Sequence, residues 1–304
     1  MEEPSLRTSE KRCAVVTGGN KGIGFEICKQ LAANGVVVIL TARDEKRGTD
    51  AVESLKESGL SDVIYHQLDI KDSSSISSLA NFINAKFKKL DILVNNAAET
   101  GLIIDGDAFR ALPYGYDSIR DEDPDMLKGI MEQTNEKAED SLRTNYYGTK
   151  AVTEALLPLL QLSNLANIVN VSSIYGQLMF IPNEKVKEEL DNVEILNEER
   201  IDELLQGFLK DFKEGRLQVN GWPNTVSAYK LSKAAVNAYT RMLARKFPNM
   251  RVNCVHPGYV KTDNTCHTGV MTTEEGAKGP VKLALLGHDG PSGHFFNQME
   301  MSVF

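Results

Sequence analysis

The sequence predicts an α/β fold in which a doubly wound parallel sheet carries helices on both faces. Three observations lead to this prediction. Short strands alternate with helices from residue 13 onward, the strands are continuous apolar runs, and a glycine-rich turn joins the first strand to the first helix. Continuous apolar strands are typical of parallel sheets that are buried on both faces. Right-handed crossovers between such strands then give the doubly wound arrangement.

The expected elements follow one another in a regular order. Strands are expected at 14–17, 36–40, 63–68, 91–94, 168–171, 251–255 and 294–296, and helices at 23–34, 45–58 and 75–87. Gly35 is expected to end the first helix, because glycine readily adopts the left-handed conformation found there. No internal repeat or linker marks a second domain. We therefore expect one Rossmann-like domain over residues 1–304.

Two stretches interrupt the alternation and are too long for ordinary connections. The first, 99–139, is polar and acidic and is expected to form a flap. The second, 176–223, is expected to be helical, with Asn197 capping an amphipathic helix. In that helix apolar residues recur on one face, which must pack on another element: Ile201, Leu204, Leu205, Phe208, Leu209 and Phe212.

Composition excludes several functional classes. The 304 residues carry 34 Lys and Arg against 42 Asp and Glu, a formal net charge of −8 at pH 7, which argues against nucleic acid. No apolar run approaches the roughly 18 residues of a membrane span, and no signal-like segment is evident, so a cytoplasmic protein is expected. The four cysteines show no CxxC pair, and the five histidines show no ligand cluster. We therefore expect free thiols and no metal.

A glycine-rich turn, TGGNKGIG at 17–24, runs directly into the first helix. Gly18 permits the tight turn, Gly22 lets the backbone approach a pyrophosphate, and Gly24 allows close packing of the helix. The helix N-terminus offers unpaired N–H groups and the positive end of its dipole. The turn therefore predicts a dinucleotide site formed by Gly18, Asn20, Lys21, Gly22, Ile23 and Gly24.

The spacing of these glycines resembles the TGxxxGxG motif of the short-chain dehydrogenase/reductase family. Further landmarks follow in the family's order: Asn95–Ala98, Asn145, the pair Ser172 and Ser173, Tyr229 with Lys233, and Pro257 and Gly258 followed by Thr262. The resemblance covers about residues 13–304. Ala98 departs from it, because the family motif NNAG has glycine there. This departure implies slightly shifted packing beside the cofactor.

The resemblance implies a catalytic set of Asn145, Ser173, Tyr229 and Lys233. Tyr229 would donate a proton to a carbonyl oxygen, to which Ser173 would donate a hydrogen bond, while Ser172 faces the sheet. Lys233 would hold the nicotinamide ribose. Together with the charge of the oxidised nicotinamide, it would also lower the pKa of Tyr229. Asn145 would position a water that links the lysine to solvent; a helix side chain bonded to backbone is its alternative role.

The resemblance also implies a nicotinamide cofactor, and charges near the adenosine ribose distinguish NAD from NADP. Ala42 stands where NAD-preferring members carry an acid, whereas Lys21, Arg43 and Arg47 bring three cations near one point. Asp44 competes with them, but we expect it to cap the following helix. NADPH is therefore expected. The family implies further cofactor contacts from Asp69 at the adenine and from Asn95, Tyr229, Lys233, Pro257, Gly258, Val260 and Thr262.

Within the family, the chain resembles the carbonyl-reductase-like branch. The glycine turn, the segment LTARD at 40–44 and the long stretch before Tyr229 carry this resemblance. In this branch the second insertion covers the helix face that tetrameric relatives use, which implies a monomer. The implied activity is NADPH-dependent reduction of a ketone or aldehyde of a bulky hydrophobic small molecule, alkaloid or terpenoid in type, to an alcohol. The alternatives are an enone C=C reductase, disfavoured by Tyr229, and a catalytically silent NADP-binding protein.

The flap is expected to roof the substrate pocket. It leaves the carboxyl end of the fourth strand, where ligands of open α/β sheets bind. An ordinary acidic surface loop is the alternative. The candidate wall residues are Ile103, Ile104, Phe109, Leu112, Tyr114 and Tyr116, together with Tyr175, Met179, Phe180 and Met271.

Overall fold

The computed structural model describes residues 11–112 and 127–304. Among these residues, eight strands form one sheet in the order β10-β9-β8-β7-β4-β1-β2-β3. All neighbours are parallel except β10, which pairs antiparallel with β9. The strands are β1 (Cys13–Val16), β2 (Val37–Ala42), β3 (Val63–Gln67), β4 (Ile92–Asn95), β7 (Asn167–Val171), β8 (Arg251–His256), β9 (Phe295–Asn297) and β10 (Glu300–Ser302). The predicted strands are confirmed to within two residues, and of the eight strands of this sheet β10 alone is absent from the prediction.

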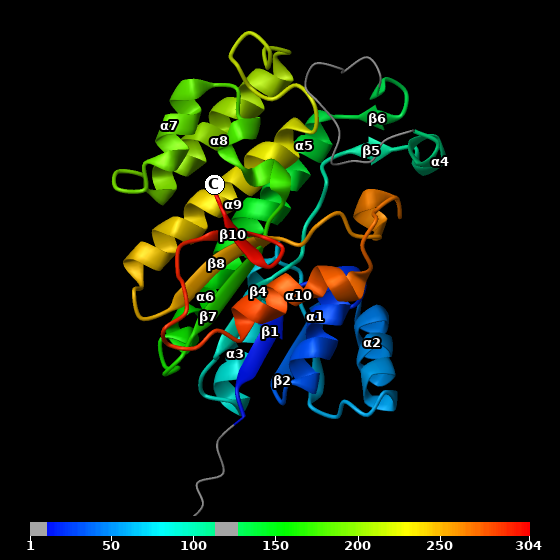
Figure 1. Cartoon of the computed structure of the whole chain (residues 1–304), viewed down its shortest axis with the longest axis vertical. Coiled ribbons are helices and arrows are strands. Elements are labelled where there is room, and N and C mark those ends of the chain that lie inside the picture. The colour runs from blue at the N-terminus through cyan, green and yellow to red at the C-terminus, as the bar shows by residue number, and fades with distance from the viewer. Residues whose placement is uncertain (1–10, 113–126) are drawn as a thin grey trace, which may run out of the picture.

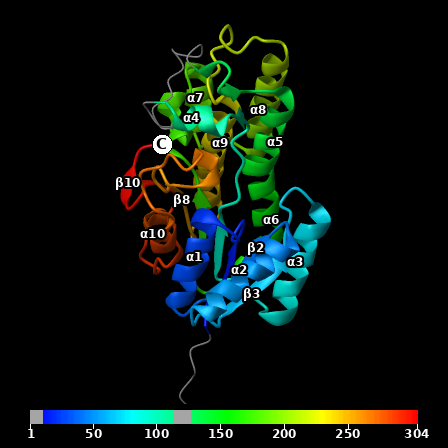
Figure 2. The same ribbon diagram turned by 90° about the vertical axis from the view of Figure 1, so that its right-hand side faces the viewer.

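Helices cover both faces of this sheet, as Figures 1 and 2 show from two directions. On one face, α1, α2 and α10 share an apolar core with the strands. On the other face, α3, α6 and α9 share a second core. Their bounds are α1 (Gly22–Ala33), α2 (Glu45–Glu57), α3 (Ser73–Lys86), α6 (Thr149–Leu160), α9 (Ser227–Lys246) and α10 (Thr273–Ala284). The doubly wound α/β fold predicted from the sequence is confirmed.

The order in which successive strands are added to the sheet reverses at β1. β2 and β3 lie on one side of β1, whereas β4, β7 and β8 lie on the other. In open α/β sheets ligands bind at such a switch point, outside the carboxyl ends of the strands. The fold therefore places the ligand crevice above β1 and β4.

Local chemistry sets the helix ends. Asp44 accepts a hydrogen bond from the Arg47 amide and so caps α2, as predicted. Asn197 caps a later helix in the same way, by accepting from the Arg200 amide. Each cap satisfies one of the amide groups that a helix N-terminus leaves without an internal partner. Gly35, with φ of +77°, follows the end of α1.

The first insertion lies over the carboxyl ends of the strands. Its described part forms a two-stranded sheet of β5 (Ile103–Ile104) and β6 (Met131–Glu132), with α4 (Gly106–Arg110) next to it. α5 (Asn135–Leu142) begins inside the predicted flap and continues through a π-helical turn, η3 (Arg143–Gly148), into α6. A separate apolar cluster joins the insertion to the crevice, formed by Leu102, Phe109, Leu127, Tyr175 and Val226.

The second insertion is helical, as predicted, but contains two helices. α8 (Glu198–Lys213) is the amphipathic helix, while α7 (Glu184–Asp191) is absent from the prediction. Short 3₁₀ turns precede them at η4 (Ile174–Gly176) and η5 (Leu178–Phe180). α8 packs on α5 and α9, and α7 packs on α9. The apolar face of α8 is buried in the larger core through Ile201, Leu204, Leu205 and Phe208.

The sequence also led to expectations about the cysteines and about membrane-spanning segments. All four cysteines are free, and Cys13, Cys28 and Cys254 are buried in the core. Across residues 11–112 and 127–304, no helix combines the length and the apolar character needed to cross a membrane.

Candidate active site

A cavity of about 560 Å³ opens at the carboxyl ends of the strands. The glycine turn, the end of β3, the segment after β4, the serine pair, α9 and the loop after β8 all line it. The structure therefore brings together most of the predicted site residues: Gly18, Asn20, Lys21, Gly22, Ile23, Gly24, Arg43, Asp69, Ser173, Tyr229, Lys233, Pro257, Gly258, Val260 and Thr262. Arg47, Asn95 and Asn145 are predicted site residues that do not line it.

The glycine turn has the shape that a pyrophosphate requires. Gly18 and Gly22 both have positive φ, +64° and +58°. A Cβ on Gly24 would lie 2.3 Å from the Gly18 carbonyl oxygen, so only glycine permits this approach of α1 to the turn. Lys21 is the N-cap residue of α1, and its side chain makes no capping bond to the helix. The first-turn amides thus remain available to an anion, and the turn fits a dinucleotide.

The three predicted phosphate cations differ in their surroundings. Arg43 lines the exposed edge of the cavity. Lys21 also lines it, but its ammonium forms an ion pair with Asp263 in the loop after β8. The pKa of Asp263 is lowered, chiefly by its hydrogen bond with Lys21. His267 contacts the same carboxylate at 3.1 Å. Arg47 is exposed and lies outside the cavity lining.

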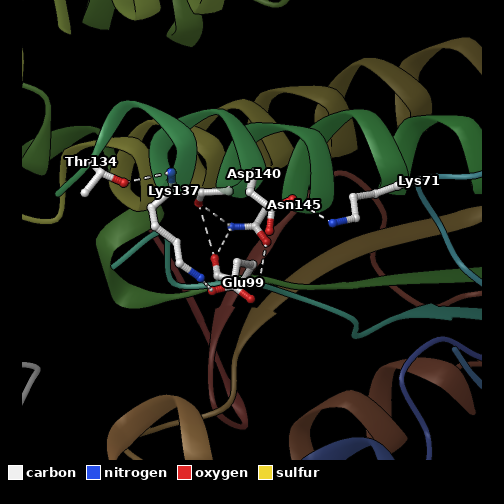
Figure 3. A network of polar contacts seen from close by, with 7 residues as sticks. Lys71, Glu99, Thr134, Lys137, Asp140 and Asn145 are labelled. Carbon is white, nitrogen blue, oxygen red and sulfur yellow. Dashed lines mark hydrogen bonds and ion pairs between the residues drawn. The ribbon is translucent and has the colours of Figure 1, made fainter. Parts of the chain in front are cut away.

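Asn145 lies in the π-helical turn η3, a form of helix that is frequent at functional sites. Its Oδ1 accepts a hydrogen bond from the Glu99 amide at 2.8 Å. Its Nδ2 donates to the Glu99 carbonyl at 2.9 Å and to Ser232 Oγ at 2.9 Å. Figure 3 shows the bonds between Asn145 and Glu99, which join the helix to the start of the first insertion. The side chain is thus bonded to backbone, as in its alternative role, and the water-positioning role stays a prediction.

Two ion pairs flank this contact (Figure 3). Lys137 Nζ lies 3.7 Å from the Glu99 carboxylate. Lys71 Nζ lies 2.6 Å from Asp140 Oδ1, and both of these residues line the cavity. One face of α5 therefore meets both the root of the flap and the edge of the cavity. Lys71, Glu99 and Asp140 belong to no motif in the sequence, which is why sequence reasoning missed them.

The side chains of Asn95 and Asn96 make different hydrogen bonds. The Asn95 side chain is buried and donates to Thr153 Oγ1 and Asn170 Oδ1. Asn96 lines the cavity, and its Nδ2 donates to the carbonyl oxygens of Thr17 and Gly18, which fixes the glycine turn to the end of β4. Asn96 belongs to the motif at 95–98, and this motif is the sequence signal that could identify it as a site residue.

Tyr229 and Lys233 stand on consecutive turns of α9 and face the cavity. Ser173 lines the same cavity, and hydrogen bonding with Ser173 acts to lower the pKa of Tyr229. Lys233 is buried, and its Nζ donates to the Val171 carbonyl at 2.8 Å and lies 5.6 Å from the centre of the Tyr229 ring. Ser172 donates instead to Asn237 Oδ1 at 2.6 Å, away from the reacting groups.

The pKa values of this pair are set mainly by burial. Burial raises the pKa of Tyr229 to about 12, and the hydrogen bond with Ser173 opposes that rise. Burial lowers the pKa of Lys233 to about 8. Burial and Ser173 account for the pKa of Tyr229, so its lowering by Lys233 together with the oxidised nicotinamide stays a prediction. Both groups are protonated at neutral pH.

His256 was not singled out by sequence reasoning. It lines the cavity before Pro257, and burial lowers its pKa to about 4. Its Nδ1 has no hydrogen-bond partner among the described residues. The imidazole is therefore neutral at physiological pH. Elsewhere in the described parts of the chain, no group of three or more His, Cys, Asp or Glu side chains could hold a metal ion.

The expected substrate walls are found only in part. Tyr175 lines the cavity, and Phe109 lies in the apolar cluster against which Tyr229 also packs. Ile103 and Met179 are 49% and 73% exposed and do not line the cavity. Tyr114 and Tyr116 lie outside the described residues. Ile104, Leu112 and Phe180 pack against the same apolar cluster. Met271 packs against Gly258 instead.

Comparison with known proteins agrees with this geometry. A family model described as short chain dehydrogenase matches residues 12–184, which is more than half of the chain. The chain belongs to the short-chain dehydrogenase/reductase family. A second model, described as enoyl-(acyl carrier protein) reductase, matches residues 217–290. As a short-chain dehydrogenase/reductase, the protein is an oxidoreductase that uses a nicotinamide cofactor.

Relatives in this family match nearly the whole chain. Salutaridine reductase from Papaver bracteatum is 52% identical over 302 residues, which cover 97% of each chain. The solved structure of salutaridine reductase from Papaver somniferum has a TM-score of 0.86 at 51% identity, covering 94% of this chain and 99% of the other. Menthone neomenthol reductase from Mentha piperita has a TM-score of 0.84 at 46% identity, covering 96% and 100%.

Proposed function

We propose that the protein reduces a ketone or aldehyde of a bulky hydrophobic small molecule to the alcohol, using NADPH. The presence of Ser173, Tyr229 and Lys233 in one cavity carries this proposal, because the same cavity holds a glycine turn that fits a dinucleotide. The names of the relatives, salutaridine reductase and menthone neomenthol reductase, support a substrate of alkaloid or terpenoid type.

When bound, NADPH would supply the hydride to the carbonyl carbon. Tyr229 and Ser173 hold the carbonyl oxygen as negative charge develops on it, and Tyr229 Oη transfers its proton to it, so that the alcohol and a tyrosinate form. A tyrosine with a pKa of about 12 is fully protonated at neutral pH and can act as an acid. The Lys233 ammonium, 5.6 Å from the ring centre, stabilises the tyrosinate until it regains a proton from solvent.

We assign the preference for NADPH over NADH to Arg43 and Lys21, with Arg47 adding charge from the surface. Lys21 exchanges its ion pair with Asp263 for the phosphate when the cofactor binds, which is feasible because both partners are more than half exposed. Asn95 and Asn145 support the site from behind the cavity. The residues assigned to direct cofactor contact are Gly18, Asn20, Gly22, Ile23, Gly24, Asp69, Tyr229, Lys233, Pro257, Gly258, Val260 and Thr262.

We further propose a monomer in the cytoplasm, with no nucleic acid or membrane partner. The packing of α7 and α8 on α9 supports the monomer, because it covers the outer surface of helices that could otherwise pair with a second copy. The acidic net charge of −8 supports the absence of nucleic acid.

The test is to incubate the protein with NADPH and a panel of cyclic ketones, aldehydes and enones, and to identify the products beside those of Tyr229→Phe. The proposal expects alcohols from the wild type and almost none from the variant. Saturated ketones formed equally by both proteins would indicate an enone C=C reductase instead. NADPH binding without turnover of any compound would indicate a catalytically silent NADP-binding protein.

A further inference from the structure

The residue immediately before the catalytic helix has an unusual backbone. Val226 has φ of +52° and ψ of +32°, in the left-handed region, and is almost fully buried in the cluster beside the cavity. A β-branched residue rarely adopts this conformation, and it persists only where the surroundings hold it. Val226 is three residues before Tyr229. The protein therefore constrains the chain at the point where the helix of the proton donor begins.

A glutamine from the first insertion supplies the cap that Val226 cannot. Gln133 Oε1 accepts from the Ser227 amide at 2.6 Å and from Ser227 Oγ at 2.5 Å. Gln133 Nε2 donates to the Asn224 carbonyl at 2.8 Å. Val226 itself forms no side-chain cap on α9. One side chain from the flap thus bonds the chain on both sides of the strained residue.

The residue that follows Gln133 caps another helix of the site. Thr134 Oγ1 accepts from the Lys137 amide at the start of α5, which continues into the π-helical turn that carries Asn145. Two consecutive residues at the end of the flap therefore cap both α9 and α5. These two helices pack against each other. Asn145 links them once more through its bond to Ser232 on α9.

The position of this cap explains why it matters for the chemistry. Ser227, Ala228 and Tyr229 form the first turn of α9, and a first turn without partners for its amides opens readily. The Tyr229 hydroxyl must remain within hydrogen-bond reach of Ser173 and of the substrate oxygen. Fixing this turn therefore fixes the direction of the proton donor.

We propose that Gln133 is a positioning residue for the reaction: it holds the first turn of α9, aims Tyr229 at Ser173, and ties the flap to the proton donor. This inference rests on the proposed carbonyl reduction. The apolar cluster of Phe109, Tyr175 and Val226 joins the same parts.

The test compares Gln133→Ala with Gln133→Glu, which keeps an acceptor for Ser227. Gln133→Ala should lower kcat on the order of ten- to a hundredfold. It should leave the Kd for NADPH unchanged, since Gln133 does not contact the glycine turn. Gln133→Glu should retain most of kcat. Asn197→Ala is the matched control, because it removes a cap from α8. It should lower the thermal midpoint to a similar extent without changing kcat.

Two further readouts separate positioning from stability. In the Tyr229→Phe background, Gln133→Ala should have little additional effect on kcat, because its action passes through the tyrosine. Amide exchange in the segment 224–231 should rise in Gln133→Ala but not in Gln133→Glu. An equal loss of kcat in both backgrounds, or unchanged exchange, would overturn the inference. If the wild type reduces no carbonyl, the proposed function fails, while the exchange comparison still tests the cap.

Discussion

Replacing Lys233 by methionine should make the protein more stable and inactive at the same time. The Lys233 ammonium is buried, and burial lowers its pKa from an ordinary 10.5 to about 8. Because each pKa unit corresponds to about 1.4 kcal/mol, the folded state bears a penalty of about 3 kcal/mol for the charged form. Lys233→Met removes this penalty but loses the bond to the Val171 carbonyl, worth about 1 kcal/mol. The net gain expected at pH 7 is about 2 kcal/mol.

The gain has a defined pH dependence. Between pH 8 and 10.5 the unfolded state binds more protons at this lysine than the folded state, so the stability of the wild type rises with pH across that window. The advantage of Lys233→Met is therefore complete below about pH 8 and shrinks above it. For the same reason, ketone reduction by the wild type should decline as the pH rises through about 8, when Lys233 loses its charge.

Urea denaturation of wild type and Lys233→Met at pH 7 and pH 10 measures this difference. Lys210→Met, on the exposed side of α8, is the control and should change the free energy of unfolding by no more than about 0.5 kcal/mol. A Lys233→Met protein that is less stable than the wild type at pH 7 would refute the reasoning, because it would show that the ammonium stabilises the fold.

Three other substitutions test other parts of the account. Gly24→Ala should raise the Kd for NADPH at least tenfold in a fluorescence titration, since its Cβ would lie 2.3 Å from the Gly18 carbonyl oxygen. An unchanged Kd would contradict the assignment of the glycine turn as the dinucleotide site. Arg43→Ala should raise the KM for NADPH about tenfold or more and leave that for NADH unaltered, which steady-state kinetics with both cofactors would show. Phe208→Ala removes a ring whose centre lies 5.5 Å from the centre of the Trp222 ring. It should lower the free energy of unfolding, measured in urea, by about 3–5 kcal/mol, and a loss below about 1 kcal/mol would argue against the packing of α8.

The parallel sheet could be predicted because its strands and glycine turn carry strong local signals. Continuous apolar runs mark β1, β2 and β4, and Gly18, Gly22 and Gly24 occupy positions that only glycine suits. β10 escaped prediction because it is short and largely exposed, so that only its pairing with β9 defines it. α7 escaped because its few buried residues give too short a periodic pattern.

Some residues of the site could also be predicted from the sequence, and others could not. Tyr229, Lys233 and Ser173 could be placed from motif spacing, since one helix and one strand end carry them. The contacts of Gln133 and Glu99 could not be foreseen, because they join residues far apart in the sequence through single side chains. The ion pair of Lys21 with Asp263 likewise depends on how a later loop returns over the glycine turn. Burial set the pKa of Tyr229, and burial is a property of the fold rather than of neighbouring residues in the chain.

The central claim is that Tyr229 gives the proton to a carbonyl oxygen. The most direct measurement is the single-turnover rate of NADPH oxidation by a cyclic terpenoid ketone, compared between wild type and Tyr229→Phe with the Kd for NADPH measured for both. The account predicts a rate lower by about a hundred- to ten-thousandfold in the variant, the range expected for loss of a general acid, at NADPH concentrations that saturate both proteins. Reduction of the ketone by Tyr229→Phe at the wild-type rate would contradict the account.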